Sequence, residues 1–169
     1  MNTFSEYNKS VDFNKYKTYS WIAPDDSSLE NQVLQNSYGK AIMSGSNTEL
    51  KKKGMVLDNQ NADVVFKYHL GVTHTTRYSQ SPTLSIGVSY GAPGYYYSGV
   101  AVPVSGGTVS ASREDEAFLI LEMYDPKTGY VLWTGGARKT VDNTADSQKN
   151  MQLALHAIFA GLPVKHKIK

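Results

Sequence analysis

The sequence predicts an α+β fold: a mainly antiparallel sheet of about five or six strands, with two helices on one face and a long hairpin arm. Three observations predict it. Residues 64–72 alternate apolar and polar side chains, which is typical of a strand with one buried face. Residues 145–160 carry an apolar stripe at helical spacing, which suits them to cover that face. Residues 78–112 contain no charged side chain, and we expect an arm there between two core strands.

Length and composition limit the possible functions. The 169 residues fit a single domain, 1–169, since domains commonly span about 100 to 200 residues. The absence of cysteine excludes disulfides, thiol nucleophiles and cysteine-ligated metals within this chain. The net charge of +2, with no basic block longer than Lys51-Lys52-Lys53, argues against a nucleic-acid partner. No apolar run approaches the ~20 residues of a membrane helix.

The N-terminal part predicts strands and one long helix. Residues 3–10 and 18–22 favour short strands on either side of a turn at 12–16. Ser27 and Glu30 form a capping-box pattern, so a helix is expected over residues 28–53. Its end is indicated by three lysines followed by Gly54, which suits a left-handed cap.

Glycines make the middle of that helix less regular. Gly39 and Gly45 each weaken a helix by about 1 kcal/mol relative to alanine. We therefore expect a kink or fraying near Gly45.

A short strand is expected at 55–57, and a longer strand with one buried face follows it. The residues of the strand's buried face are Val64, Phe66, Tyr68, Leu70 and Val72. Residues 118–121 are apolar on both faces and favour a central strand. A tight turn at 125–129 then leads into a hairpin partner at 130–140. The stripe of the last helix consists of Met151, Leu155, Ile158 and Leu162. Trp21 and Trp133 are expected in the core.

The uncharged segment 78–112 is rich in tyrosine and glycine. Residues 84–90 alternate as a strand, and residues 100–104 are expected to return beside it, with the tip of the arm at 92–94. An uncharged edge is open to pairing with another chain, so we expect residues 83–104 to bind a protein, a glycan or a second copy.

Tyrosine is the candidate binding residue of that arm, because three adjacent rings cannot all enter one core. The candidate binding residues are Tyr90, Tyr95, Tyr96 and Tyr97. The alternative is intramolecular, with Leu84, Ile86 and Val88 buried under the protein's own helices.

One motif suggests catalysis. Residues 87–91 match the G-x-S-x-G pattern of serine hydrolases, with Ser89 as the nucleophile. That chemistry requires a strained turn between a strand and a helix, whereas Ser89 lies inside the alternating strand. A non-enzymatic protein is favoured, and a hydrolase using Ser89 is the alternative.

The other chemical candidates favour structural roles. His69 and His74 are an odd number of residues apart on one strand, so they face opposite ways and cannot share a metal. His69 is expected on the solvated face. The carboxylates at 25–26 fit helix-cap chemistry, and those at 114–116 fit a solvated lead-in to a strand. Gly135 and Gly136, like Gly106 and Gly107, are interpreted as turn and bulge glycines. No metal and no cofactor is expected.

Three segments, in order along the chain, resemble one bacterial family. They are residues 7–21, residues 62–69 with an alanine-aspartate start, and the turn 125–129 with Trp133 and Gly135 behind it. Together they are similar to the domain of unknown function 4136, which occurs in predicted envelope lipoproteins. The family has no established catalytic residues, so none is transferred to this chain.

The resemblance implies a cell-envelope location, periplasmic or outer-membrane-associated, and a binding or scaffolding role. It also implies a lipid anchor on a cysteine upstream of the first strand, as the only membrane attachment. The chain contains neither a leader nor a cysteine. Either both precede Met1 in the native protein, which we favour, or this member is not anchored.

Overall fold

The computed structural model describes residues 1–24, 29–80, 109–141 and 147–166. Contacts within the chain define two compact units: Met1–Thr73 with Glu116–Lys169, here the core unit, and His74–Asp115, here the arm unit. The core unit contains both helices and most of the sheet. The expectation of a single domain with an inserted arm stays a prediction.

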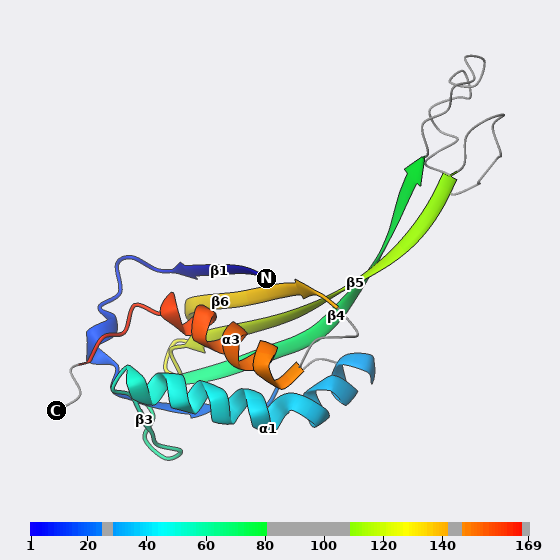
Figure 1. Cartoon of the computed structure of the whole chain (residues 1–169). Helices are drawn as coiled ribbons and strands as arrows, with labels where there is room; N and C mark the ends of the chain where they lie inside the picture. Colours follow the sequence, from blue (N-terminus) through cyan, green and yellow to red (C-terminus); the bar gives the residue numbers. More distant parts are fainter. Residues whose placement is uncertain (25–28, 81–108, 142–146, 167–169) are drawn as a thin grey trace. The chain divides into compact units, whose positions relative to one another are not determined.

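The strands form one six-stranded sheet in the order β1-β6-β5-β4-β2-β3 (Figure 1). Their bounds are Asn2–Tyr7 (β1), Thr18–Trp21 (β2), Val56–Leu57 (β3), Val64–Gln80 (β4), Val109–Tyr124 (β5) and Val131–Thr140 (β6). β6 pairs antiparallel with β1 and β5, whereas β2 pairs in parallel with both β3 and β4. The α+β fold and the mainly antiparallel sheet are therefore confirmed, and the parallel pairs are an addition to the prediction.

Two helices, α1 (Leu29–Lys52) and α3 (Ser147–Ala160), lie side by side over one face of the sheet (Figure 1). A single 3-10 turn, Phe13–Lys15, occupies the predicted turn between β1 and β2. Gly54 adopts a φ of 82° just after α1, as its predicted cap role requires. Of the predicted stripe, Leu155 and Ile158 of α3 and Leu162 just after it are buried, and Met151 of α3 packs beside them.

Helix α1 runs without a break through Gly45, so the expected fraying there is wrong, and the alternative of a kink stays a prediction. Both glycines instead allow close packing. A Cβ on Gly39 would lie 2.5 Å from the hydroxyl oxygen of Tyr68, and one on Gly45 would lie 2.5 Å from Cδ1 of Leu155. Contacts with β4 and α3 therefore offset the weak helix propensity of these two residues.

The core is centred on aromatic rings from distant parts of the chain. Phe66 of β4 is fully buried, and its ring centroid lies 5.7 Å from that of Trp21 and 6.2 Å from that of Phe159. Trp133 is also fully buried, and Trp21 is partly buried against the same cluster. The predicted burial of Phe66, Tyr68 and Leu70 is confirmed, and it fixes the register of β4.

Gly135 and Gly136 are not bulge residues, which corrects the interpretation of the sequence. Both lie inside β6 in regular register with β1 and β5. The irregularity of the β5–β6 ladder occurs at Met123 and Tyr124 instead. The glycines are required because large rings pack over them: Trp133 over Gly135 on the helix side, and Phe4 over Gly136 on the opposite side.

Asp63 joins the start of β4 to the start of β2. The backbone N–H groups of Lys17 and Thr18 donate to its Oδ2 over 2.7 and 3.0 Å. These bonds, that from Lys17 first, lower the pKa of the Asp63 carboxyl below its usual value. The carboxylate therefore stabilises the parallel β2–β4 pair.

Replacing Asp63 by asparagine is expected to lower the free energy of unfolding by about 1 kcal/mol at pH 7, because an exposed acceptor loses its charge. The folded-state pKa is depressed, so this contribution is complete above the unfolded value of about 3.9 and is lost as the pH falls through the folded value. Urea unfolding at pH 7 and at pH 3 measures it. Glu6→Gln, at an exposed residue of β1, is the control, and an equal effect of both substitutions at pH 7 would contradict the assignment.

Candidate functional site

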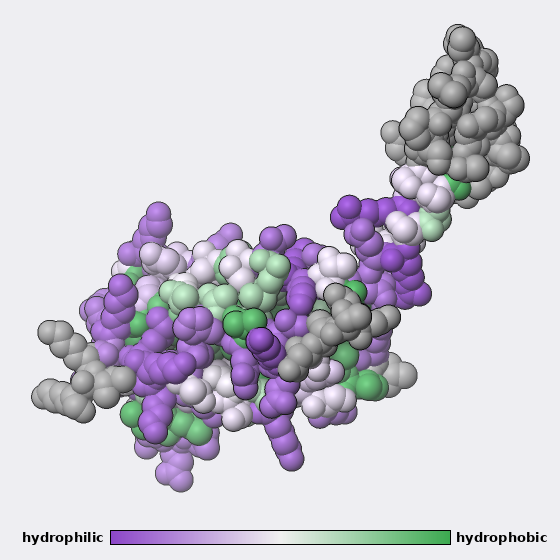
Figure 2. Space-filling model, viewed as in Figure 1, coloured by the Kyte–Doolittle hydropathy of each residue, from purple (hydrophilic) through white to green (hydrophobic). Residues whose placement is uncertain are grey.

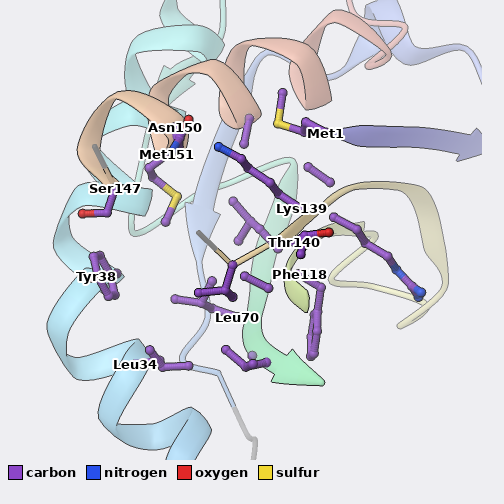
Figure 3. Close-up of a pocket in the computed structure, with 18 residues that line it drawn as sticks. Met1, Leu34, Tyr38, Leu70, Phe118, Lys139, Thr140, Ser147, Asn150 and Met151 are labelled. Atoms are coloured by element: carbon purple, nitrogen blue, oxygen red, sulfur yellow. The ribbon is translucent and has the colours of Figure 1, made fainter. Parts of the chain in front are cut away.

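A cavity of about 260 Å³ opens in the core unit between the two helices and strands β4, β5 and β6 (Figure 3). Leu34 and Tyr38 of α1 form one wall, and Met151 of α3 forms another. Leu70 and Phe118 approach it from the sheet (Figure 3). Side chains from five elements thus converge on one mostly apolar space.

Small side chains leave this space open. Three alanines line the cavity, Ala117 of β5, Ala137 of β6 and Ala154 of α3. Ala117 lies opposite Lys139, and Ala137 lies opposite Leu119, in the β5–β6 register. Because the interior of a protein is otherwise closely packed, alanine at three converging positions leaves a cavity where larger residues would fill it.

Polar groups are few and lie toward the rim. The Lys139 side chain extends from β6 toward α3, where Ser147 and Asn150 are located (Figure 3). Lys139 is half-buried and, within the described residues, its ammonium group has no hydrogen-bond or ion-pair partner. The charged residues among the described lining are Arg138 and Lys139, both cationic. The arrangement can therefore hold an apolar group beside a positive charge.

Apart from the cavity, His69, Glu122 and Tyr124 form a polar cluster on the sheet in the core unit. Nε2 of His69 is 3.0 Å from Oε2 of Glu122, and the hydroxyl of Tyr124 donates to the same oxygen. His69 is thus half-buried and bonded to a carboxylate, although the sequence predicted only a solvated position. The alternation of Leu121 and Met123 with Glu122 and Tyr124 could have indicated this shared face. His69 and Tyr124 both bind the Glu122 carboxylate and hold it in place, which suits a structural role.

The arm unit has its own cross-strand network. Nδ1 of His74 lies 2.7 Å from Oδ1 of Asp115, and Nε of Arg113 donates to the same oxygen over 3.1 Å. Arg77 and Glu114 form an ion pair of 2.9 Å. The acidic residues 114–116 are therefore inside β5, and Glu114 and Asp115 are paired with side chains of β4, which corrects the prediction of a lead-in to a strand. Their surroundings explain the charges without catalysis.

The residues singled out in the sequence for binding or nucleophilic chemistry are outside the described residues. These are Tyr90, Tyr95, Tyr96, Tyr97 and Ser89, together with the carboxylates at 25–26. Their roles stay predictions. Within the described ranges, no three His, Asp or Glu side chains are grouped so that they could hold a metal ion.

A family model for the domain of unknown function 4136 matches residues 3–164. The chain belongs to this DUF4136 family. The matched range includes every described residue of the cavity lining except Met1. No curated protein matches the sequence. Among the described parts of this DUF4136 chain, no helix has the length and apolar character needed to span a membrane.

Solved structures share the fold of this DUF4136 chain. One is the PelC dodecamer from Paraburkholderia phytofirmans, at 12% identity and a TM-score of 0.52, with 98% of this chain and 99% of that chain covered. Another is a PDZ domain protein from Parabacteroides distasonis, at 14% identity and a TM-score of 0.54. That match covers 98% of this chain and 36% of the other. At such identities the likeness concerns the fold alone.

Proposed function

We propose that the chain is a non-enzymatic binding module of the bacterial cell envelope and that the apolar cavity is its ligand site. The observation that carries the proposal is the cavity itself: apolar side chains from α1, α3 and the sheet surround it, and a few polar groups lie at its rim. Ligand pockets commonly have this composition, because the apolar walls supply affinity and the polar groups supply orientation. The envelope location is supported by the resemblance to predicted envelope lipoproteins.

The surface around the cavity supports an accessible site. Figure 2, viewed from the helix side, shows hydrophobic residues between hydrophilic ones over α3. Met1, beside β1, is exposed and also lines the cavity. An apolar ligand would therefore enter through a rim that is itself partly apolar.

Filling the cavity tests this proposal. Decan-1-ol, a neutral apolar probe, is expected to bind the parent protein, and Ala117→Leu is expected to weaken its binding at least tenfold because the larger side chain occupies the space. Isothermal titration calorimetry measures the affinity, and circular dichroism checks the fold. Ala41→Leu adds the same carbons at an exposed position of α1 and is the control. Failure of the parent to bind, or equal binding by both variants, would contradict the proposal.

We also propose a scaffolding role for the tyrosine-rich segment 83–104, which carries no charge. Tyr95, Tyr96 and Tyr97 combine large contact areas with polar tips, as residues that anchor interfaces do. The related fold of PelC assembles as a dodecamer, so a second copy of this chain is one partner that the proposal includes.

Replacing residues 91–99 by a short glycine linker is expected to change the oligomeric state or abolish binding to a partner. Light scattering coupled to size-exclusion chromatography measures the first, and pull-down and glycan-binding assays measure the second. A shortened variant that matches the parent in all these assays would remove the segment from the functional account.

A further inference from the structure

We infer that the cavity takes the alkyl chain of a single-chain anionic amphiphile, whose head group binds Lys139. This inference rests on the proposed function and adds the class of ligand. It combines the charge at the rim of the cavity with its size.

Lys139 lies on the side of β6 that faces the helices. β6 directs alternate residues toward the helices, and Trp133 and Ala137 use these positions to fill the core. Lys139 is the next residue on that side and lines the cavity, so a cation occupies a position that otherwise carries core side chains. A lysine can lay its apolar stem along such a wall and keep its ammonium group at the rim.

The charged side chains that line the cavity are cationic. The described lining contains two cationic side chains and no carboxylate side chain, and the first turn of α3 carries no acidic residue. Lys139 has no ion-pair partner among the described residues. A carboxylate at the rim would form a charge-assisted hydrogen bond with the ammonium group, whereas a cationic head group would be repelled.

The size of the cavity limits the length of the alkyl chain that it can hold. An apolar cavity of about 150 Å³ is known to hold benzene, which has six carbon atoms. In proportion, the volume of about 260 Å³ holds roughly ten carbon atoms. That is one medium-length alkyl chain and too little for the two chains of a phospholipid. Decanoate is therefore the appropriate probe.

The experiment compares three probes of equal chain length, decanoate, decan-1-ol and decyltrimethylammonium, by isothermal titration calorimetry at concentrations below micelle formation. The parent is expected to bind decanoate at least tenfold more tightly than decan-1-ol and to bind the cation most weakly. Lys139→Met is expected to remove the preference for decanoate over decan-1-ol. Lys139→Arg retains the charge and is expected to keep the preference.

Lys9→Met removes an exposed lysine elsewhere and is the matched control, expected to behave as the parent. If the parent binds decan-1-ol as tightly as decanoate, or if Lys139→Met keeps the preference, the anionic ligand is wrong and the apolar binding site stands. If the parent binds none of the three probes, both the inference and the proposed function are overturned.

Discussion

Phe66→Ala is expected to lower the free energy of unfolding by about 3 to 5 kcal/mol, since it removes a large side chain from a closed core. Phe66 is fully buried, and edge-to-face contacts join its ring to Tyr19 at 5.8 Å and to Trp133 at 6.4 Å between centroids. The cavity left behind would be lined by rings that other contacts hold in place. Trp133, for example, stacks on Phe159 with centroids 5.9 Å apart.

Urea unfolding followed by tryptophan fluorescence measures this loss. Phe4→Ala is the control of the same residue type, because Phe4 lies on the edge strand β1 and is 38% exposed. Its expected effect is under about 1.5 kcal/mol, since less of the side chain is removed from water on folding. Equal effects of the two substitutions would mean that the aromatic cluster around Phe66 is not the centre of the core. A loss of 3 to 5 kcal/mol is a large part of the roughly 5 to 15 kcal/mol that stabilises a typical domain.

Local periodicity explains which elements could be predicted from the sequence. The alternation through Phe66, Tyr68 and Leu70 predicted both the strand and its buried face, and the stripe of residues 151–162 predicted the helix that covers it. These patterns work because a strand and a helix place side chains with fixed periods of 2 and 3.6 residues. Gly54 and Gly129 have positive φ values, and they correctly indicated the end of α1 and the turn between β5 and β6.

The order of the strands could not be predicted in this way. β2 lies between β3 and β4 and pairs in parallel with both, and a bond of 2.9 Å from the N–H of Ile22 to the carbonyl of Phe66 extends that pairing. Nothing in the spacing of residues 18–22 indicates the direction of the neighbouring strands. Parallel pairing depends on where the connecting segment, here α1, returns the chain.

The cavity was missed for a related reason. Its small residues, Ala117, Ala137 and Ala154, are spread over three elements, and each alone is an ordinary alanine. A void appears only when tertiary packing brings them together. One signal was present in the sequence: Lys139 continues the core-facing positions of Trp133 and Gly135 in β6 with a charged residue.

Gly135→Ala is expected to lower the free energy of unfolding by about 2 to 3 kcal/mol, because the added methyl group has no room in the core. Without that overlap, alanine would suit a strand better than glycine. The new Cβ would overlap Cζ2 of Trp133 and lie 2.9 Å from Cγ2 of Ile158. Trp133 cannot move aside easily, because its Nε1–H donates to Oγ of Ser5 over 2.8 Å and its ring stacks on Phe159. The strain must therefore be taken up by the core.

Gly136→Ala is the matched control one residue away. Its Cβ would lie 2.5 Å from Cζ of Phe4, the end of a partly exposed side chain that can rotate into solvent. The expected change is within about 1 kcal/mol, since relief of the overlap costs little and alanine reduces the entropy of the unfolded chain. Thermal and urea unfolding of both variants measures the difference. If Gly136→Ala is as destabilising as Gly135→Ala, the two faces of β6 are equally closed, and the assignment of the helix side as the core side is wrong.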